Sequence, residues 1–186
     1  MDLYRPVVGG EVMLQEFVDQ VEKAARSVME EMHTAIPGKI TAFNPGTGQA
    51  TVKPYGTFTT GAGKKMAYPA VTGVPVIIPQ CPSANVQIAF PIMPGMDCLI
   101  IVSEQELDAW LGGGESENDM RFDLTNAIAL PGLSNKGSAA LQEACATGNI
   151  IVSNSSTKLC VSKSGIEITG NLDVKGNISC TGSYPG

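Results

Sequence analysis

Apolar residues near the start of the chain recur at alternating steps of four and three positions. Between residues 11 and 33 this spacing matches the a and d positions of a heptad, which predicts one amphipathic helix. The members of the stripe are Leu14, Val18, Val21, Ala25, Val28 and Met32, and Phe17, Ala24 and Met29 widen it. Such a short helix is marginal by itself. It therefore lies either on its own domain or in a three-helix bundle.

From Gly38 to Pro131 the apolar residues follow a two-residue period that is interrupted by turns. Residues 39–43 and 49–54 flank the turn at 44–48, which predicts a hairpin. Further apolar runs, each bounded by Pro or Gly, occupy residues 71–78, 85–90 and 97–103. About five short strands in this stretch favour a small OB-type barrel. We also expect a short helix over residues 105–111, ended by glycines.

The end of the chain repeats every six residues, as GIEITG, NLDVKG and NISCTG. Two apolar positions in each unit lie two residues apart, so they share one face of a short strand, and a glycine closes the unit. The two apolar columns are Ile166, Leu172 and Ile178, and Ile168, Val174 and Cys180. Looser units of the same kind occur earlier, at Ile150 with Val152 and at Leu159 with Val161.

So few repeats cannot bury an apolar column within one chain, because a single-chain β-helix needs many coils. Three intertwined chains would instead bury each apolar layer on a shared axis. We therefore expect a homotrimer whose core is formed by the two columns. A single-chain β-helix and an unstructured tail are the alternatives.

These patterns predict a mainly β protein with an N-terminal helix, an OB-type small barrel and a C-terminal intertwined trimeric β-helix. The expected parts are a helical segment over 1–35, a barrel over 36–131, a connector over 132–147 and a triple-stranded β-helix spike over 148–186. The connector has no clear period and has room for one helical turn.

Composition and charge exclude some classes of function. The chain has 21 glycines, 12 prolines and a net charge of −6. An acidic chain without clustered Lys and Arg argues against nucleic-acid binding. The N-terminus does not resemble a secretory signal, and no run reaches the roughly 20 apolar residues of a membrane-spanning helix. We therefore expect synthesis in a bacterial cytoplasm.

Few residues are candidates for catalysis or metal binding. The five cysteines (Cys81, Cys98, Cys145, Cys160 and Cys180) form no C-x-x-C pair, so we expect buried free thiols. His33 is the single histidine, which leaves no histidine pair for a metal; we expect it to be solvated beside the helical stripe. The acidic group Glu115, Glu117, Asp119 and Asp123 matches no calcium loop. We expect no enzyme activity.

Several segments taken in order carry a family resemblance. They are Gly38–Pro45, Pro75–Pro79, Phe90–Asp97, Leu99–Glu104, Leu107–Trp110 and Arg121–Ile128, followed by the hexads. Over residues 36–182 the chain resembles the central spike proteins of phage baseplates, also called baseplate assembly or membrane-puncturing spike proteins. The resemblance implies an OB-fold collar, a trimer and a pointed β-helix that is pushed at the target cell envelope when the tail sheath contracts. It also implies a place in the baseplate of a phage or tailocin, next to tail tube, hub and wedge proteins.

One feature of these relatives is missing. They often end in a His-x-His pair, so that three chains hold one iron at the apex. No histidine occurs near the end of this sequence. We therefore expect no iron and no other cofactor, and an apex closed either by Tyr184 or by a small tip-capping protein.

Two rival functions belong to other classes. An OB-fold module for single-stranded nucleic acid or carbohydrate would use aromatic stacking, in the case of nucleic acid beside a basic groove. A hexapeptide-repeat acyltransferase would need a catalytic histidine on a long β-helix, and the sequence has neither.

Overall fold

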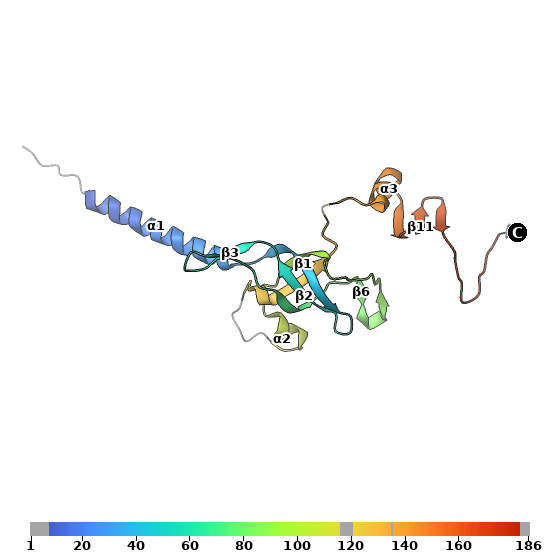
Figure 1. The fold of residues 1–186 in the computed structure, drawn as a ribbon, viewed down its shortest axis with the longest axis horizontal. Coiled ribbons are helices and arrows are strands. Elements are labelled where there is room, and N and C mark those ends of the chain that lie inside the picture. The colour runs from blue at the N-terminus through green and yellow to red at the C-terminus, as the bar shows by residue number, and fades with distance from the viewer. Residues whose placement is uncertain (1–7, 116–120, 135, 183–186) are drawn as a thin grey trace, which may run out of the picture. The chain divides into compact units, whose positions relative to one another are not determined.

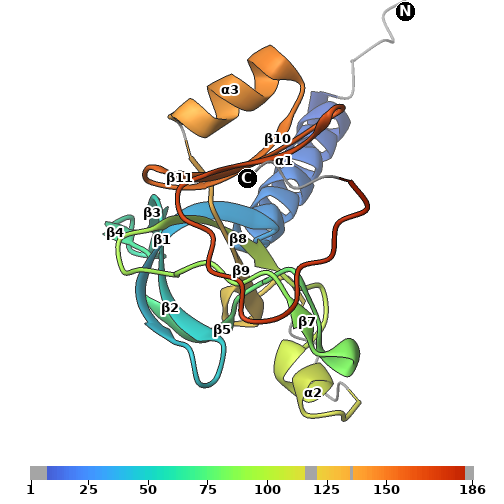
Figure 2. The same ribbon diagram turned by 90° about the vertical axis from the view of Figure 1, so that its right-hand side faces the viewer.

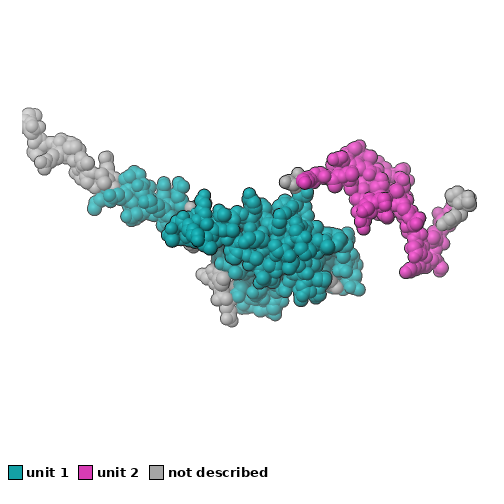
Figure 3. All heavy atoms as spheres, viewed as in Figure 1, with its two compact units in different colours: residues 1–134 teal, residues 135–186 magenta. Residues whose placement is uncertain are grey.

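The computed structural model describes residues 8–115, 121–134 and 136–182. The chain divides into two compact units, residues 1–134 and 135–186 (Figure 3). Among the described residues no helix is both long and apolar enough to span a membrane.

The predicted N-terminal helix is present as α1, Val8–Glu31 (Figure 1). It begins three residues earlier than the expected range and ends two residues earlier, since the chain becomes extended before Pro37. On its surface the side-chain amide of Gln15 donates a 3.1 Å hydrogen bond to Asp19. Every described side chain of α1, from Met13 to Met29, is exposed. The apolar stripe is therefore uncovered in the single chain.

Unit 1 is built on a five-stranded antiparallel sheet with the strand order β5-β2-β1-β8-β9. The strands are β1 Ala35–Asn44, β2 Gln49–Pro54, β5 Val71–Pro75, β8 Asp97–Val102 and β9 Ala127–Pro131. Directly after β5, Val76 forms a parallel bridge with Ala129. The Ile77 N–H also donates a 2.9 Å hydrogen bond to the Ala129 carbonyl. The sheet thus curves into a half-barrel whose two edges meet at this bridge (Figure 2).

The strand alternation places one face of each strand in the core. Ile40, Val52 and Ile100 have 0% exposure, and they come from β1, β2 and β8. The rest of the core is made of small residues and a few larger ones: Ala50, Val74, Val76, Ile92, Cys98, Ala127 and Ala129. In the first half of β1, Gly38 leaves room for Ile100, because a Cβ there would lie 2.5 Å from Ile100 Cδ1. Small and medium-sized aliphatic side chains therefore fill most of the core.

Unit 1 also contains several short elements outside the five-stranded sheet. Two hairpins, one helix and two 3₁₀ turns are present: β3 Thr57–Thr59 with β4 Lys65–Ala67, β6 Gln80–Cys81 with β7 Val86–Gln87, α2 Leu107–Leu111, η1 Pro82–Ala84 and η2 Leu124–Asn126. The predicted strand over 85–90 is wrong for most of its length, since only Val86 and Gln87 are paired. Residues 88–90 are exposed and outside any strand. The Ile88 N–H still donates a 2.9 Å hydrogen bond to the Pro79 carbonyl. The predicted helix at 105–111 is confirmed as α2.

Unit 2 consists of a helix and a three-stranded meander. Its elements are α3 Ala139–Thr147, β10 Ile150–Asn154, β11 Thr157–Ser162 and β12 Gly165–Thr169. Ser138 caps α3 by accepting a 3.1 Å hydrogen bond from the Leu141 N–H. Gly148 ends the helix in the left-handed conformation, with φ 68°. The expected connector thus contains a nine-residue helix rather than one turn, because a serine cap and a terminal glycine bound a stretch of helix formers.

The hexads differ among themselves. The first one forms β12, which pairs with β11. Over residues 171–182, which hold the other two, the structure has no strand. Unpaired strands are not stable alone. The fold class is therefore confirmed as mainly β with a half-barrel sheet and a few helices, while the intertwined trimeric β-helix stays a prediction.

Candidate interaction surfaces

One face of the unit 2 meander is mostly apolar, with the polar pair Asn154 and Thr157 at one end. Leu159 on the central strand lies opposite Val152 on one side and Ile168 on the other. Val161 likewise lies between Ile150 and Ile166. Directly paired residues share a face of a sheet. We call these six side chains the apolar sheet face: Ile150, Val152, Leu159, Val161, Ile166 and Ile168.

This face is open to solvent in the single chain. Ile150 is 66% exposed and Ile166 is 68% exposed, and these β-branched residues lie near the ends of the two outer strands, β10 and β12. Leu159 and Val161 on the central strand are half-buried. A contiguous exposed apolar face of this kind is a candidate interaction surface.

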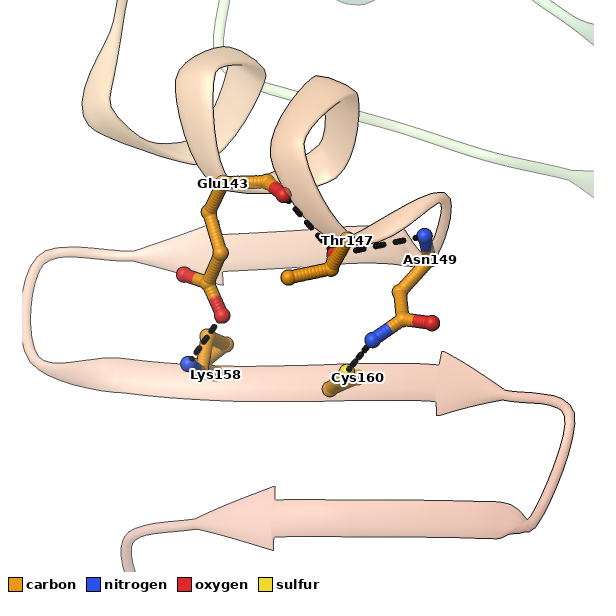
Figure 4. A network of polar contacts seen from close by, with 5 residues as sticks. All are labelled: Glu143, Thr147, Asn149, Lys158 and Cys160. Atoms are coloured by element: carbon orange, nitrogen blue, oxygen red, sulfur yellow. Dashed lines mark hydrogen bonds and ion pairs between the residues drawn. The ribbon is translucent and has the colours of Figure 1, made fainter.

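The opposite face is covered by α3. The Cys160 side chain on that face is 7% exposed. Lys158 Nζ lies 2.7 Å from Glu143 Oε1 of α3, and Asn149 Nδ2 lies 3.5 Å from Cys160 Sγ (Figure 4). Thr147 Oγ1 donates a 2.8 Å hydrogen bond to the Glu143 carbonyl, which closes the last turn of α3. The helix therefore selects which face of the sheet remains free.

Of the predicted trimer-core residues, the structure brings only Ile166 and Ile168 into a sheet. The other four, Leu172, Val174, Ile178 and Cys180, are exposed and lie beyond the last strand. Leu172 is 65% exposed and Ile178 59%. The single chain thus gives these apolar side chains no core of their own. Their trimer contacts stay a prediction.

The helical stripe is a second uncovered apolar surface. Its exposed fractions are Leu14 65%, Val18 41%, Val21 51%, Val28 60% and Met32 43%. Ala25, at the centre of the stripe, is exposed as well. The structure therefore places the stripe from Leu14 to Val28 on one helix, while Met32 lies one residue beyond the end of α1. No element of the described chain covers these residues.

Some residues lie elsewhere than expected. Cys98 and Cys160 are buried, but Cys81, Cys145 and Cys180 are exposed, so the prediction of uniformly buried thiols is wrong. These three lie on a hairpin, on the short α3 and past the last strand, where no second layer covers them. Burial raises the pKa of the Cys98 thiol, and a hydrogen bond from Ser83 lowers the pKa of Cys81.

His33 is half-buried rather than solvated. Its backbone N–H donates a 3.1 Å hydrogen bond to the Phe122 carbonyl. Its ring packs edge-on against Tyr68, with ring centroids 5.4 Å apart. Tyr68 also packs against Phe58, with ring centroids 5.4 Å apart. These three rings line a groove of about 1130 Å³. The heptad pattern could not reveal this position, because His33 lies just beyond α1.

Asp123 has a local structural role. It accepts hydrogen bonds from the Thr125 N–H at 2.8 Å and from the Thr125 hydroxyl at 2.5 Å, which cap η2 and lower the pKa of Asp123. Glu115 is exposed, whereas Glu117 and Asp119 lie outside the described residues. In the described ranges no three His, Cys, Asp or Glu side chains are grouped to hold a metal ion.

A family comparison bears directly on the half-barrel. Residues 36–132 match the family described as Phage protein Gp138 N-terminal domain, and this range is just over half of the chain. The chain belongs to this family. A comparison with curated proteins found no match.

The Gp138 N-terminal domain runs from the second residue of β1 to the residue after β9, so it contains the whole five-stranded sheet. Membership of a phage protein family indicates a structural role in a phage. The helical stripe and the apolar sheet face both lie outside the matched range. Along the sequence, the Gp138 N-terminal domain is therefore preceded by one exposed apolar surface and followed by another.

Proposed function

We propose that the chain is the trimeric central spike of a contractile phage tail or tailocin baseplate. In this role it caps the tail tube and helps to pierce the target cell envelope. The observation that carries the proposal is the apolar sheet face, which one chain exposes and three chains can bury. The phage family supports the setting.

The half-barrel fits the collar of such a spike. Its strand order, with β1 between β2 and β8 and with the bridge between Val76 and β9, supports an OB-type barrel. A rigid barrel offers a flat, stable base on which tail tube, hub and wedge proteins can assemble. We infer that these proteins are the partners of unit 1.

Unit 2 fits the start of the spike shaft. Three copies of the apolar sheet face, turned toward a common axis, would form a closed prism with α3 on the outside. The hexads after β12 would continue the prism, since their apolar residues keep the same two-residue spacing. Closure would also remove the unpaired edge of β12. A prism of this kind is stiff along its axis, which suits the transmission of force.

The mass of the full chain in solution tests the trimer. Light scattering at micromolar concentration should give three times the chain mass of 19.4 kDa. A matched pair of variants on β10 tests the surface: Val152→Asp places a carboxylate on the apolar sheet face, and Ser153→Asp places one on the opposite face. Burial of an unpaired charge costs several kcal/mol. We expect Val152→Asp to dissociate the trimer and Ser153→Asp to leave it intact.

A particle experiment tests the function itself. Phage produced with the Val152→Asp chain should lose infectivity because the spike does not assemble, while phage produced with Ser153→Asp should remain infective. Full infectivity of both variants would contradict the spike role.

The groove lined by His33, Phe58 and Tyr68 favours one second candidate, an OB-fold module that binds carbohydrate or a single strand of nucleic acid. Aromatic rings are the usual stacking platforms for such ligands. Binding of an oligonucleotide or an envelope glycan to the full chain, abolished by Tyr68→Ala, would favour this alternative.

A further inference from the structure

We propose that α1 forms a parallel three-stranded coiled coil with the α1 helices of two other copies of this chain. The inference rests on the proposed trimer and adds a second, independent contact at the N-terminal side of the Gp138 N-terminal domain. Its occupant is the same helix from another copy, rather than the barrel of its own chain.

The period of the stripe is that of a coiled coil. With Val18 at position a, Ala25 is also an a position, and Leu14, Val21 and Val28 are d positions. Met32 continues the spacing but lies just beyond the end of α1. The described side chains of this stripe are all exposed, so the helix does not bury them on its own unit. A lone helix of 24 residues with such a face gains most of its stability from a partner.

The residue types at the seam favour three strands over two. Two-stranded coiled coils prefer a β-branched residue at a and leucine at d. Here β-branched valine occupies both kinds of position, with Val18 at a and Val21 and Val28 at d. β-branched residues at both positions shift the preference toward higher oligomers.

The flanking positions indicate a parallel arrangement. In a parallel coiled coil, position g of one helix faces position e of its neighbour, five residues further along. Ala24 is a g position and Met29 is an e position, separated by that interval. Both are apolar and exposed in the single chain. Their contact across neighbouring helices would widen the seam, as three helices require.

Four of the five charged residues between Leu14 and Val28 fit the pattern, and the fifth, Glu22, lies at an e position. Glu16, Asp19, Lys23 and Arg26 all lie at b and f positions, which face solvent in a coiled coil. The spacings from Asp19 to Lys23 and from Glu22 to Arg26 are four residues, acid first, which stabilises each helix internally. With six acidic and two basic residues, α1 is unsuited to an anionic membrane surface.

A first test uses two neighbouring substitutions in the full chain, Val21→Asp at d and Gln20→Asp at c. α1 contributes 24 helical residues, against 5 in α2 and 9 in α3. We expect Val21→Asp to remove more than half of the helical circular dichroism signal on mild heating, while Gln20→Asp behaves as the unmodified protein. Equal helical melting of the two variants would overturn the coiled coil.

A second test does not depend on destabilising the helix. Leu14→Cys at d should form an interchain disulfide under mild oxidation, whereas Glu16→Cys at f should show only the cross-linking of the unmodified chain with its native cysteines. Equal cross-linking of both variants in a trimeric protein would overturn the coiled coil alone. A monomeric unmodified chain would instead overturn the proposed function. A trimer that survives Val152→Asp but is lost on Val21→Asp would support the coiled coil and contradict the sheet contact.

Discussion

The ammonium group of Lys158 lies 2.7 Å from Glu143 Oε1, which ties α3 to one face of the central strand of the meander. The contact matters because it fixes the face that is covered. Val152 and Val161 lie on the opposite face of the sheet, where no described element covers them. A polar pair on one side of the sheet thus defines an apolar surface on the other.

The pair should make the stability of unit 2 depend on alkaline pH. The hydrogen bond to Glu143 raises the pKa of Lys158 above 10.5. The stabilisation is therefore fully present below pH 10.5, and it is lost as the pH rises through the higher pKa of the folded state. Glu143→Gln should lower the thermal midpoint slightly and flatten this alkaline decline, because an ion pair that water still reaches contributes little. Thermal scans between neutral pH and pH 11 measure both effects.

Asp123 should give an acid-dependent contribution. The Thr125 hydroxyl and amide hold the pKa of Asp123 below 3.8. Its stabilisation is present above pH 3.8 and is lost as the pH falls through the lowered pKa of the folded state. Asp123→Asn should reduce stability at neutral pH and weaken the acid-induced loss seen in the unmodified chain. Urea unfolding at neutral pH and near pH 3 would show this; parallel losses in both proteins would contradict it.

A side chain at position 38 in β1, in place of Gly38, should destabilise the sheet. A Cβ there would lie 2.5 Å from Ile100 Cδ1 and 2.8 Å from the Lys53 carbonyl oxygen. Gly38→Ala should therefore destabilise unit 1 by about 1–3 kcal/mol, as overpacking does. Gly61→Ala is the matched control, because nothing lies within 4 Å of a Cβ at that position. Chemical denaturation should separate the two variants.

The thiols should differ in their reactivity. Cys98 has 0% exposure and burial raises its pKa, so a thiol reagent at pH 8 should modify it only after unfolding. Cys81 is exposed and its pKa is lowered, so it should react first. Mass spectrometry of labelled peptides resolves each site. In a trimer with the predicted core, Cys180 should be protected as well, although it is exposed in the single chain.

The register of the last hexads can be read from two adjacent residues. Val174 and Lys175 are both exposed in the single chain, so neither has a structural role there. In the trimer, Val174→Asp would place three carboxylates on the axis at a cost of several kcal/mol each. Lys175→Asp would face outward. We expect only Val174→Asp to lower the thermal midpoint of the trimer; the same midpoint in both variants would rule out this register.

Much of the architecture could be predicted because it follows from local periodicity. The heptad spacing from Leu14 to Met32 identified α1, and the turn at 44–48 identified the hairpin of β1 and β2. The strand at 85–90 was mistaken because apolar β-formers such as Ile88 form a strand only where a partner strand continues beside them. Here the strand pairing ends at Gln87, and one further hydrogen bond joins the Ile88 N–H to the Pro79 carbonyl. β9 was not expected as a strand, since Ala127 and Ala129 are weak β-formers that tertiary packing places in the core.

The sequence by itself determined the helical stripe, the two-residue alternation of the half-barrel and the six-residue repeat, because each is a local pattern of side-chain spacing along the backbone. Only the tertiary structure decided which strands pair and which faces are covered. Pairing across β10, β11 and β12 joined Ile150, Leu159 and Ile168, which sequence spacing alone had left in separate units, into one face. Covering by α3 then left that face exposed, since a three-stranded sheet has two faces and a single helix can bury only one.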